Sequence, residues 1–152
     1  MPLCGSVCAL RRILFDSITV RNSHLGEEEQ MPASSDQPIR IANCSGFFGD
    51  RLSAAKEMVY GGPIDALTGD WLAELTMLIL SRIQAKAPGG GYARTFVTQM
   101  EDVMGECLDR KIKVVTNAGG LNPEGCADAV QEVADRLGLN PSIAYVAGDD
   151  LT

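Results

Sequence analysis

The stretch that most constrains the fold of this chain runs from Ile112 to Gly125 and reads I-K-V-V-T-N-A-G-G-L-N-P-E-G. It opens with a short apolar run rich in β-branched residues, which is too brief for a helix and predicts a buried strand. Gly119 and Gly120 then allow a sharp turn and a close approach to another part of the chain. Asn122 is a typical helix N-cap, and Pro123 suits the first helical position because its missing N–H needs no partner there. The stretch therefore predicts strand, turn and helix, which is half of a βαβ unit.

The same alternation of short strands and longer helices continues through the chain from residue 39 onward. Helices are indicated by apolar side chains at helical spacing, such as Leu72, Leu75 and Ile79. The predicted strands cover 39–43, 63–67, 112–115 and 142–146, and the predicted helices cover 51–60, 71–86, 92–109 and 123–137. This alternation predicts an α/β fold, with a mainly parallel, Rossmann-like β-sheet of about four strands and helices on both faces.

Residues 1–37 differ in composition from the rest of the chain. Leu10, Ile13 and Leu14 recur at helical spacing among arginines, as in a weak amphipathic targeting peptide, whereas three consecutive glutamates at 27–29 argue against one. A stretch rich in Pro, Ser and Gln follows and has the composition of a linker. We therefore predict a disordered or weakly ordered extension over 1–37, with a targeting peptide as the alternative, and the α/β domain over 38–152.

The charge balance excludes two classes of partner. Thirteen Lys and Arg against 20 Asp and Glu give a net charge of −7, which does not suit a nucleic-acid or anionic membrane surface. No apolar run approaches the roughly 20 residues that a membrane-spanning helix needs. We expect a soluble, cytoplasmic protein, and a mitochondrial location is the alternative if residues 1–25 are a presequence.

The distribution of histidine and cysteine restricts the chemistry of the domain. The single histidine, His24, lies in the extension, so the domain has no imidazole for general-base catalysis or for a zinc site. Proton transfer would therefore fall to another side chain, such as a carboxylate. Cys44, Cys107 and Cys126 lie in apolar patterns typical of buried thiols. Cys44 also neighbours a predicted site loop, so a nucleophilic role is an alternative for that thiol.

The unusual residues of the domain gather at the exits of the four predicted strands. In an open parallel sheet, ligands bind in the crevice beyond the carboxyl ends of the strands. We predict that this edge binds a small-molecule ligand through Asn43, Ser45, Gly46, Thr68, Gly69, Gly119, Gly120 and Asn122. The opposite strand ends carry ordinary connectors such as Gly61-Gly62-Pro63. The alternative is that Gly and Asn at the exits simply form tight βα turns.

Carboxylates at the same edge suggest catalysis or metal binding. Asp70, Asn117 and Asp149 are the predicted catalytic residues, and Asp70 is the leading acid/base candidate. Asp70, Asp149 and Asp150 offer the hard oxygen ligands that Mg²⁺ prefers. A helix cap is the alternative role for Asp70, and an exposed strand end is the alternative for Asp149-Asp150. The glycine turns could bind an anion, but neither has Walker A or dinucleotide-binding spacing, so no nucleotide cofactor is predicted.

Five segments, in chain order, carry a longer and more specific pattern. They are 41–55, which opens I-A-N-C-S-G-F-F-G-D-R, 61–77, which contains G-G-P-I-D-A-L-T-G-D-W, and then 92–96, 113–123 and 148–150. Together these segments resemble the AtuA-like family, the acyclic terpene utilisation proteins. Residues 1–37 have no counterpart in the family pattern, and the family domain continues beyond the point where this sequence stops. The resemblance thus implies the amino-terminal part of the family domain, and hence an incomplete sheet.

The resemblance also implies a place in metabolism. The family is associated with isoprenoid catabolism, in which bacteria break down acyclic terpenoids such as citronellol and geraniol through coenzyme A thioesters. It implies an enzyme domain that acts on a branched acyl-CoA or hydroxy-acid intermediate, with coenzyme A as part of the substrate. We expect a homo-oligomer or a complex with a partner subunit. The alternatives are a non-catalytic ligand-binding or subunit module that needs a partner chain, and an inactive truncated product.

Overall fold

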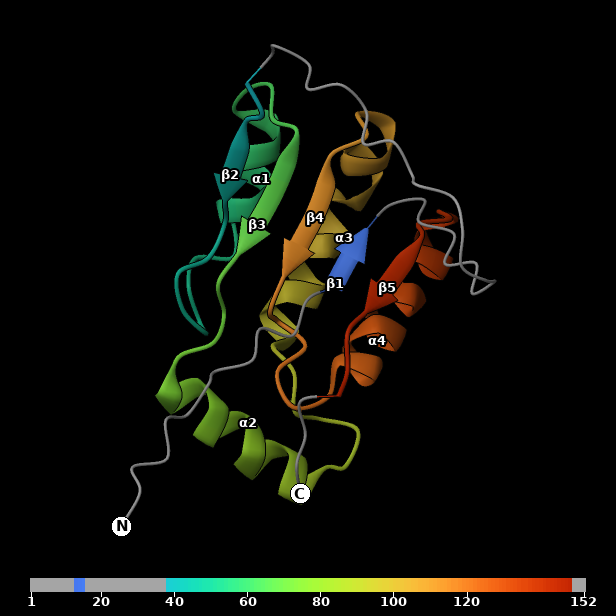
Figure 1. Cartoon of the computed structure of the whole chain (residues 1–152). Helices are drawn as coiled ribbons and strands as arrows, with labels where there is room; N and C mark the ends of the chain where they lie inside the picture. Colours follow the sequence, from blue (N-terminus) through green and yellow to red (C-terminus); the bar gives the residue numbers. More distant parts are fainter. Residues whose placement is uncertain (1–12, 16–37, 149–152) are drawn as a thin grey trace, which may run out of the picture.

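The computed structural model of the chain describes residues 13–15 and 38–148 (Figure 1). The elements in chain order are β1 (Ile13–Phe15), β2 (Ile41–Asn43), α1 (Ala54–Tyr60), β3 (Ala66–Gly69), α2 (Glu74–Lys86), α3 (Arg94–Asp109), β4 (Lys113–Thr116), α4 (Pro123–Leu137) and β5 (Ile143–Tyr145). Every helix and strand predicted between residues 39 and 146 is present, with ends shifted by a few residues.

The strands form one sheet in the order β2-β3-β4-β1-β5. β2, β3 and β4 pair in parallel, whereas β1 pairs antiparallel with both β4 and β5. The predicted α/β fold with a mainly parallel sheet is therefore confirmed. β1 falls within the predicted extension and is a strand, although its sequence has helical spacing. The remaining residues of that extension lie outside the described part of the chain.

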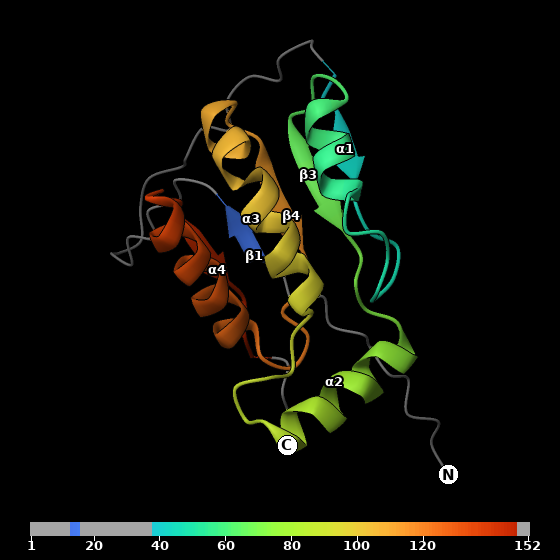
Figure 2. The ribbon, with the colours of Figure 1, turned by 180° about the vertical axis from the view of Figure 1, so that it is seen from behind.

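Three helices cover one face of the sheet, and α2 lies elsewhere. Figure 1 shows α1, α3 and α4 side by side behind the strands, and Figure 2 shows them in front from the opposite side, while α2 crosses below the strand ends in both views. The strand order explains this arrangement, because right-handed crossovers that always move in one direction across a sheet place every connecting helix on the same face. Helices were predicted on both faces, but the described residues place none on the second face, where Ile41 is 64% exposed.

The core fills the space between the sheet and these three helices. Alternate strand residues face the helices, and Leu67 of β3 and Val114 of β4 are buried there together with Phe96, Val103 and Val130. Burial of side chains of this size contributes about 1.5–3 kcal/mol each. This packing fixes the helices against the sheet, so the strand ends and the turns that follow them are held in place.

The signals predicted at the start of α4 are confirmed. The Asn122 side chain accepts a hydrogen bond from the Gly125 N–H at 2.9 Å, and Pro123 occupies the first turn. Gly138 ends the helix in the left-handed conformation, with φ of 67°. α2, in contrast, begins at Glu74 and not at Trp71, because the backbone is still extended at its N-cap, Ala73, with φ of −119° and ψ of 170°.

Candidate functional site

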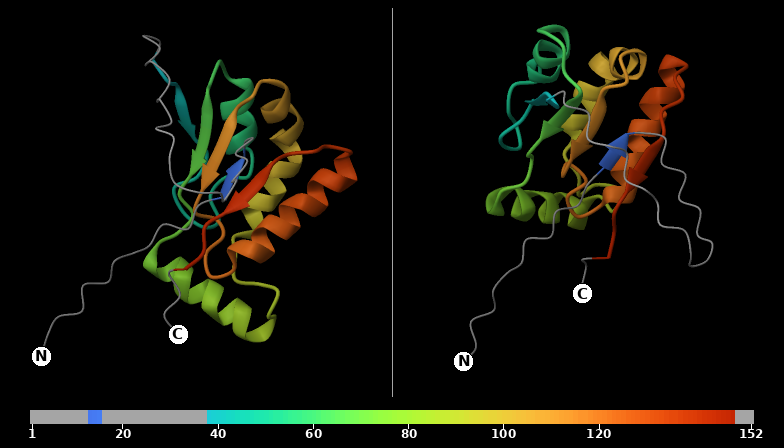
Figure 3. Two further views of the ribbon diagram at one scale, coloured as in Figure 1. Left: turned by 45° about the vertical axis from the view of Figure 1, so that its right-hand side comes forward. Right: turned by 45° about the horizontal axis from the view of Figure 1, so that its top comes forward.

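Three strand exits lie side by side at the carboxyl edge of the sheet (Figure 3). The parallel register sets Asn43 beside Thr68, and Gly69 beside Thr116. Two hydrogen bonds then tie the exits together beyond the strands. The Asp70 N–H donates to the Ser45 carbonyl at 3.0 Å, and the Thr116 hydroxyl donates to the Gly69 carbonyl at 3.1 Å. Residues that are far apart in the sequence therefore share one edge.

Asp70 and Asn117 form the central contact of this edge. Asn117 Nδ2 donates to Asp70 Oδ1 at 2.7 Å, while Asn117 Oδ1 accepts the Trp71 N–H. The Leu72 N–H donates to the same Asp70 oxygen at 3.1 Å. The Asn117 side chain is almost buried, whereas Asp70 is exposed. The carboxylate is thus oriented through Oδ1, and no described residue donates a hydrogen bond to Oδ2.

The turn after β4 is closely packed. A β-carbon on Gly120 would lie 2.6 Å from both the Gly91 carbonyl oxygen and the Leu80 side chain, and one on Gly119 would lie 2.9 Å from Pro123. The Gly120 N–H donates to the Asn117 carbonyl at 3.2 Å. Both glycines are therefore required by packing, and the binding role predicted for them stays a prediction.

Asn122 is also fully engaged by its own chain. Besides capping α4, its Nδ2 donates to the Gly90 carbonyl at 3.0 Å. This contact joins the start of α4 to the glycine-rich connection between α2 and α3. The helix-cap role is therefore established by the geometry, and the ligand-binding role predicted for Asn122 stays a prediction.

The loop after β2 satisfies its own polar groups. The Asp50 carboxylate accepts the Gly46 N–H at 3.0 Å and the Arg51 N–H at 2.7 Å, and these two bonds lower the pKa of Asp50. The Ser45 hydroxyl donates to the Phe47 carbonyl at 3.1 Å. An intrachain carboxylate thus already occupies the backbone donor that was predicted to bind an anion at Gly46.

The remaining predicted residues of the first two exits differ in exposure. Asn43 is exposed at the end of β2, and the Thr68 hydroxyl donates to the Ala42 carbonyl at 3.2 Å. Gly69 is buried, and a β-carbon there would lie 2.7 Å from Trp71 Nε1 and 3.4 Å from Cys44 Sγ. Gly69 thus leaves room for the indole ring.

The fourth predicted exit leads into Asp149 and Asp150, which lie outside the described residues. Within residues 13–15 and 38–148, no three or more His, Cys, Asp or Glu side chains are arranged to hold a metal ion. Of the predicted Mg²⁺ ligands, only Asp70 is among these residues, while Asp149 and Asp150 are not, so this metal site stays a prediction.

Burial keeps the domain's thiols protonated. Desolvation raises the pKa of Cys44 to about 11, that of Cys107 to about 11 and that of Cys126 to about 12. All three are free cysteines, and all three are buried. Because thiolates are the reactive form, the structure favours the structural role of Cys44 over the nucleophilic alternative.

Trp71 also lies at this edge, although it was not among the predicted site residues. Its side chain is fully buried and meets Phe96 edge to face, with ring centroids 6.1 Å apart. Among the described residues, its Nε1 has no hydrogen-bond partner, and the same is true of Gln99 Oε1 and Thr95 Oγ1. The available signal was the position of the sole Trp, directly after Asp70.

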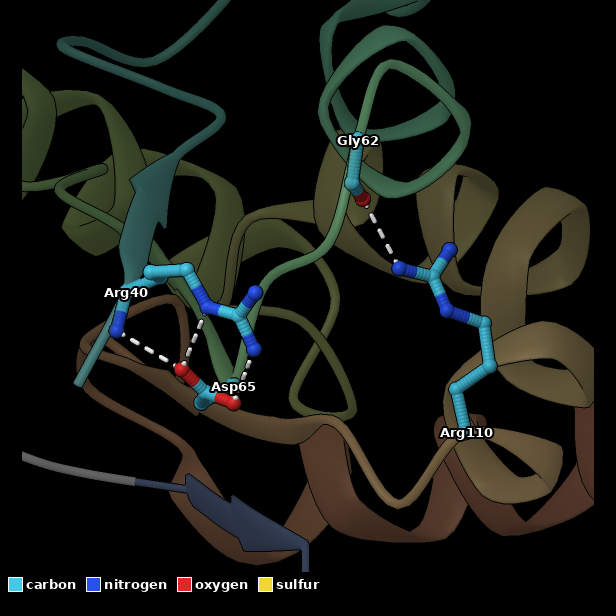
Figure 4. Close-up of polar contacts among 4 residues, drawn as sticks. All are labelled: Arg40, Gly62, Asp65 and Arg110. Atoms are coloured by element: carbon cyan, nitrogen blue, oxygen red, sulfur yellow. Dashed lines mark hydrogen bonds and ion pairs between the residues drawn. The ribbon is translucent and has the colours of Figure 1, made fainter. Parts of the chain in front are cut away.

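The opposite, amino edge of the sheet carries charged contacts of another kind (Figure 4). Arg40 binds the Asp65 carboxylate through three hydrogen bonds of 2.7 to 3.0 Å, and this arginine lowers the pKa of Asp65 to about 2. Arg110 donates to the Gly62 carbonyl at 2.8 Å and to the Val59 carbonyl, at the end of α1. Arg110 thus stabilises the end of α1, because cations favour helix C-termini.

Comparison with known protein families gives a match. Residues 39–152 match the family model described as Acyclic terpene utilisation family protein AtuA. The chain belongs to this family. The AtuA match begins just before β2 and includes all the strand exits described above. No curated protein and no solved structure matches the chain significantly.

Membership of the AtuA family suggests a role in acyclic terpene utilisation. It also bears out the resemblance drawn from the five sequence segments. Among the described residues of this AtuA chain, no helix is long and apolar enough to cross a membrane.

Proposed function

We propose that this AtuA chain is an enzyme domain that acts on a branched acyl-CoA or hydroxy-acid intermediate of acyclic terpene catabolism. The proposed site is the carboxyl edge of the sheet. The observation that carries the proposal is the Asp70–Asn117 contact, in which one carboxylate oxygen is held at 2.7 Å and the side chain stays exposed. We also propose that the protein is cytoplasmic and that its substrate is a small molecule.

Asp70 would act as the general acid or base. Its Oδ1 accepts hydrogen bonds from Asn117 and from the Leu72 N–H, so the carboxylate is oriented before a substrate binds. Oδ2 then offers a lone pair toward solvent for proton transfer. Since the chain's one histidine is His24, a carboxylate is the available base of the domain. Asn117 would hold Asp70 in position.

Two further groups belong to the proposal. Asp149 follows the fourth strand exit and would add a second catalytic carboxylate, and Asp70, Asp149 and Asp150 would be the ligands of a Mg²⁺ ion. Coenzyme A would enter as part of the substrate. Calorimetric titration with MgCl₂ and with coenzyme A, each on the unmodified chain and on the Asp149→Asn variant, tests both additions.

The main test is turnover or growth with altered Asp70. A terpene-degrading bacterium that lacks its own AtuA gene is given the protein or its Asp70→Asn variant and is grown on citronellol. Loss of a general base lowers the rate by about 10²–10⁴-fold, so growth should stop in the variant. Asp65→Asn, an aspartate change at the amino edge, is the matched control and should support growth. Full growth with a folded Asp70→Asn protein would remove Asp70 from the mechanism.

A second candidate function is a non-catalytic module that works with a partner chain. The observation that favours it is the face of the sheet that no described helix covers, where Ile41 of β2 is 64% exposed. Apolar strand residues of this kind are normally covered by another element. If this candidate is correct, Asp70→Asn leaves growth unchanged, whereas a charged residue at Ile41 prevents it.

A further inference from the structure

We propose that the outer face of α2 is the surface through which two copies of this chain associate, with their α2 helices antiparallel across a two-fold axis. This inference does not depend on the proposed enzyme activity. It concerns the helix that crosses the carboxyl edge apart from the three-helix layer (Figures 1 and 3).

The inner face of α2 is fixed to its own chain. Leu80 is fully buried, and its Cδ1 lies so close to Gly120 that a β-carbon there would be 2.6 Å away. Ile83 Cγ2 packs in the same way against Gly90, at 2.9 Å from a β-carbon built there. These contacts determine which side of the helix faces outward.

The outward side carries large apolar residues followed by cations. Leu75 and Leu78 are 67% and 49% exposed, and Arg82 and Lys86 are exposed after them. The spacing of three, four and four residues places these four side chains along one line of the helix, which we name the α2 stripe. Leu75 and Leu78 are neighbours on the helix surface and form one exposed apolar patch, which is a candidate contact surface.

The charges flanking the leucines select a second copy of the same helix. Exposed Glu74 stands at the amino end of α2, and Arg82 lies eight residues later, about 12 Å along the axis. In an antiparallel pair, Glu74 of each copy meets Arg82 of the other, and the leucines meet at the centre. A parallel pair would place like charges together. Glu74, Leu78 and Arg82 are four residues apart and lie on one side of α2, so this set is self-complementary, as a two-fold interface requires.

An anionic membrane is the competing occupant of the α2 stripe. Leucines with basic residues also suit the interface of such a membrane. The net charge of −7 and the presence of Glu74 beside Leu75 oppose that partner. We therefore assign the stripe to a second copy, and the membrane becomes one outcome of the test.

Sedimentation of the whole chain over a range of concentrations tests the proposal. The unmodified chain should show a monomer–dimer equilibrium. Leu78→Glu should weaken the dimer by about 100-fold, because two leucines lose their burial. Leu137→Glu is the matched control, since Leu137 is a 44% exposed leucine on another helix, and it should sediment like the unmodified chain. Circular dichroism checks that each variant is folded.

A charge exchange makes the test specific for the antiparallel geometry. Glu74→Lys alone and Arg82→Glu alone should each weaken the dimer by about tenfold, since both of its charge pairs become repulsive. An equimolar mixture of these two variants should dimerise like the unmodified chain, because a mixed dimer has two attractive pairs. The proposal is overturned by a monomer at every concentration, by no recovery in the mixture, or by binding to phosphatidylserine vesicles without dimerisation.

Discussion

The two edges of the sheet use the same types of polar side chain for different purposes. At the amino edge, both oxygens of Asp65 are bound by Arg40, and Arg110 donates to backbone carbonyls at the end of α1. At the carboxyl edge, Asp70 is held through one oxygen and is exposed. A carboxylate that is saturated by its own chain stabilises the fold, whereas one that is oriented and left open can react.

The two edges also differ in how closely other atoms pack around a glycine. Gly62 at the amino edge has open space around the position of a β-carbon, whereas Gly120 at the carboxyl edge is in contact with Gly91 and Leu80. Packing thus requires glycine at position 120 but not at position 62. This is expected where turns must hold polar groups in fixed positions.

Among the substitutions that test the difference between the edges, Gly120→Ala should cause the largest loss in the free energy of unfolding. The new methyl group meets backbone and side-chain atoms at 2.6 Å, and φ of 52° strains any residue other than glycine. We expect a loss of about 2–4 kcal/mol in the free energy of unfolding. Gly62→Ala is the control and should change stability by about 0.5 kcal/mol or less. Urea denaturation measures both, and equal losses in the two variants would contradict the difference between the edges.

A smaller effect is predicted at the amino edge for Arg110→Met. The change removes hydrogen bonds to two carbonyls while keeping an apolar side chain, and should lower the free energy of unfolding by about 1–2 kcal/mol. Arg136→Met provides the comparison, because Arg136 makes an exposed ion pair with Glu101 at 3.0 Å. Such pairs contribute about 0–1 kcal/mol. If the two variants lost the same stability, the capping role of Arg110 would be refuted.

The smallest predicted effect is the contribution of Asp65 to the pH dependence of stability in acid. The pKa of Asp65 is about 2 in the folded chain and about 3.9 when unfolded, so its ionised form stabilises the fold above pH 4. That contribution is lost as the pH falls from about 4 toward 2. In urea denaturation across this range, Asp65→Asn should show a shallower loss of stability than the unmodified chain. Identical slopes would show that Arg40 does not stabilise the Asp65 carboxylate.

Local signals made much of the fold predictable. The Asn122-Pro123 start and the Gly138 end of α4 could be read directly, because caps depend on a few neighbouring residues. The parallel sheet followed from the alternation of strands and helices. The single-face layering could not be read in this way, since it depends on strand order. The same limit applies to β1, whose pairing with β4 and β5 joins distant parts of the chain.

The candidate site was predictable in place but not in detail. The sequence pointed to Asp70 and Asn117 separately, and the parallel register brings their turns together. The sequence could not reveal that Asp50 binds the Gly46 N–H, because loop geometry decides which donors are free. Nor could it show that packing requires Gly120.

The most direct test of the difference between the edges is a titration followed by amide nuclear magnetic resonance. Citronellyl-CoA is added to the ¹⁵N-labelled chain, and shifts are mapped by residue. We expect the largest shifts at the carboxyl edge, on amides such as Ser45, Asp70 and Asn117, while the amide signals of Arg40 and Gly62 change little. Shifts concentrated on Arg40, Gly62 and Asp65 would contradict the assignment of function to the carboxyl edge.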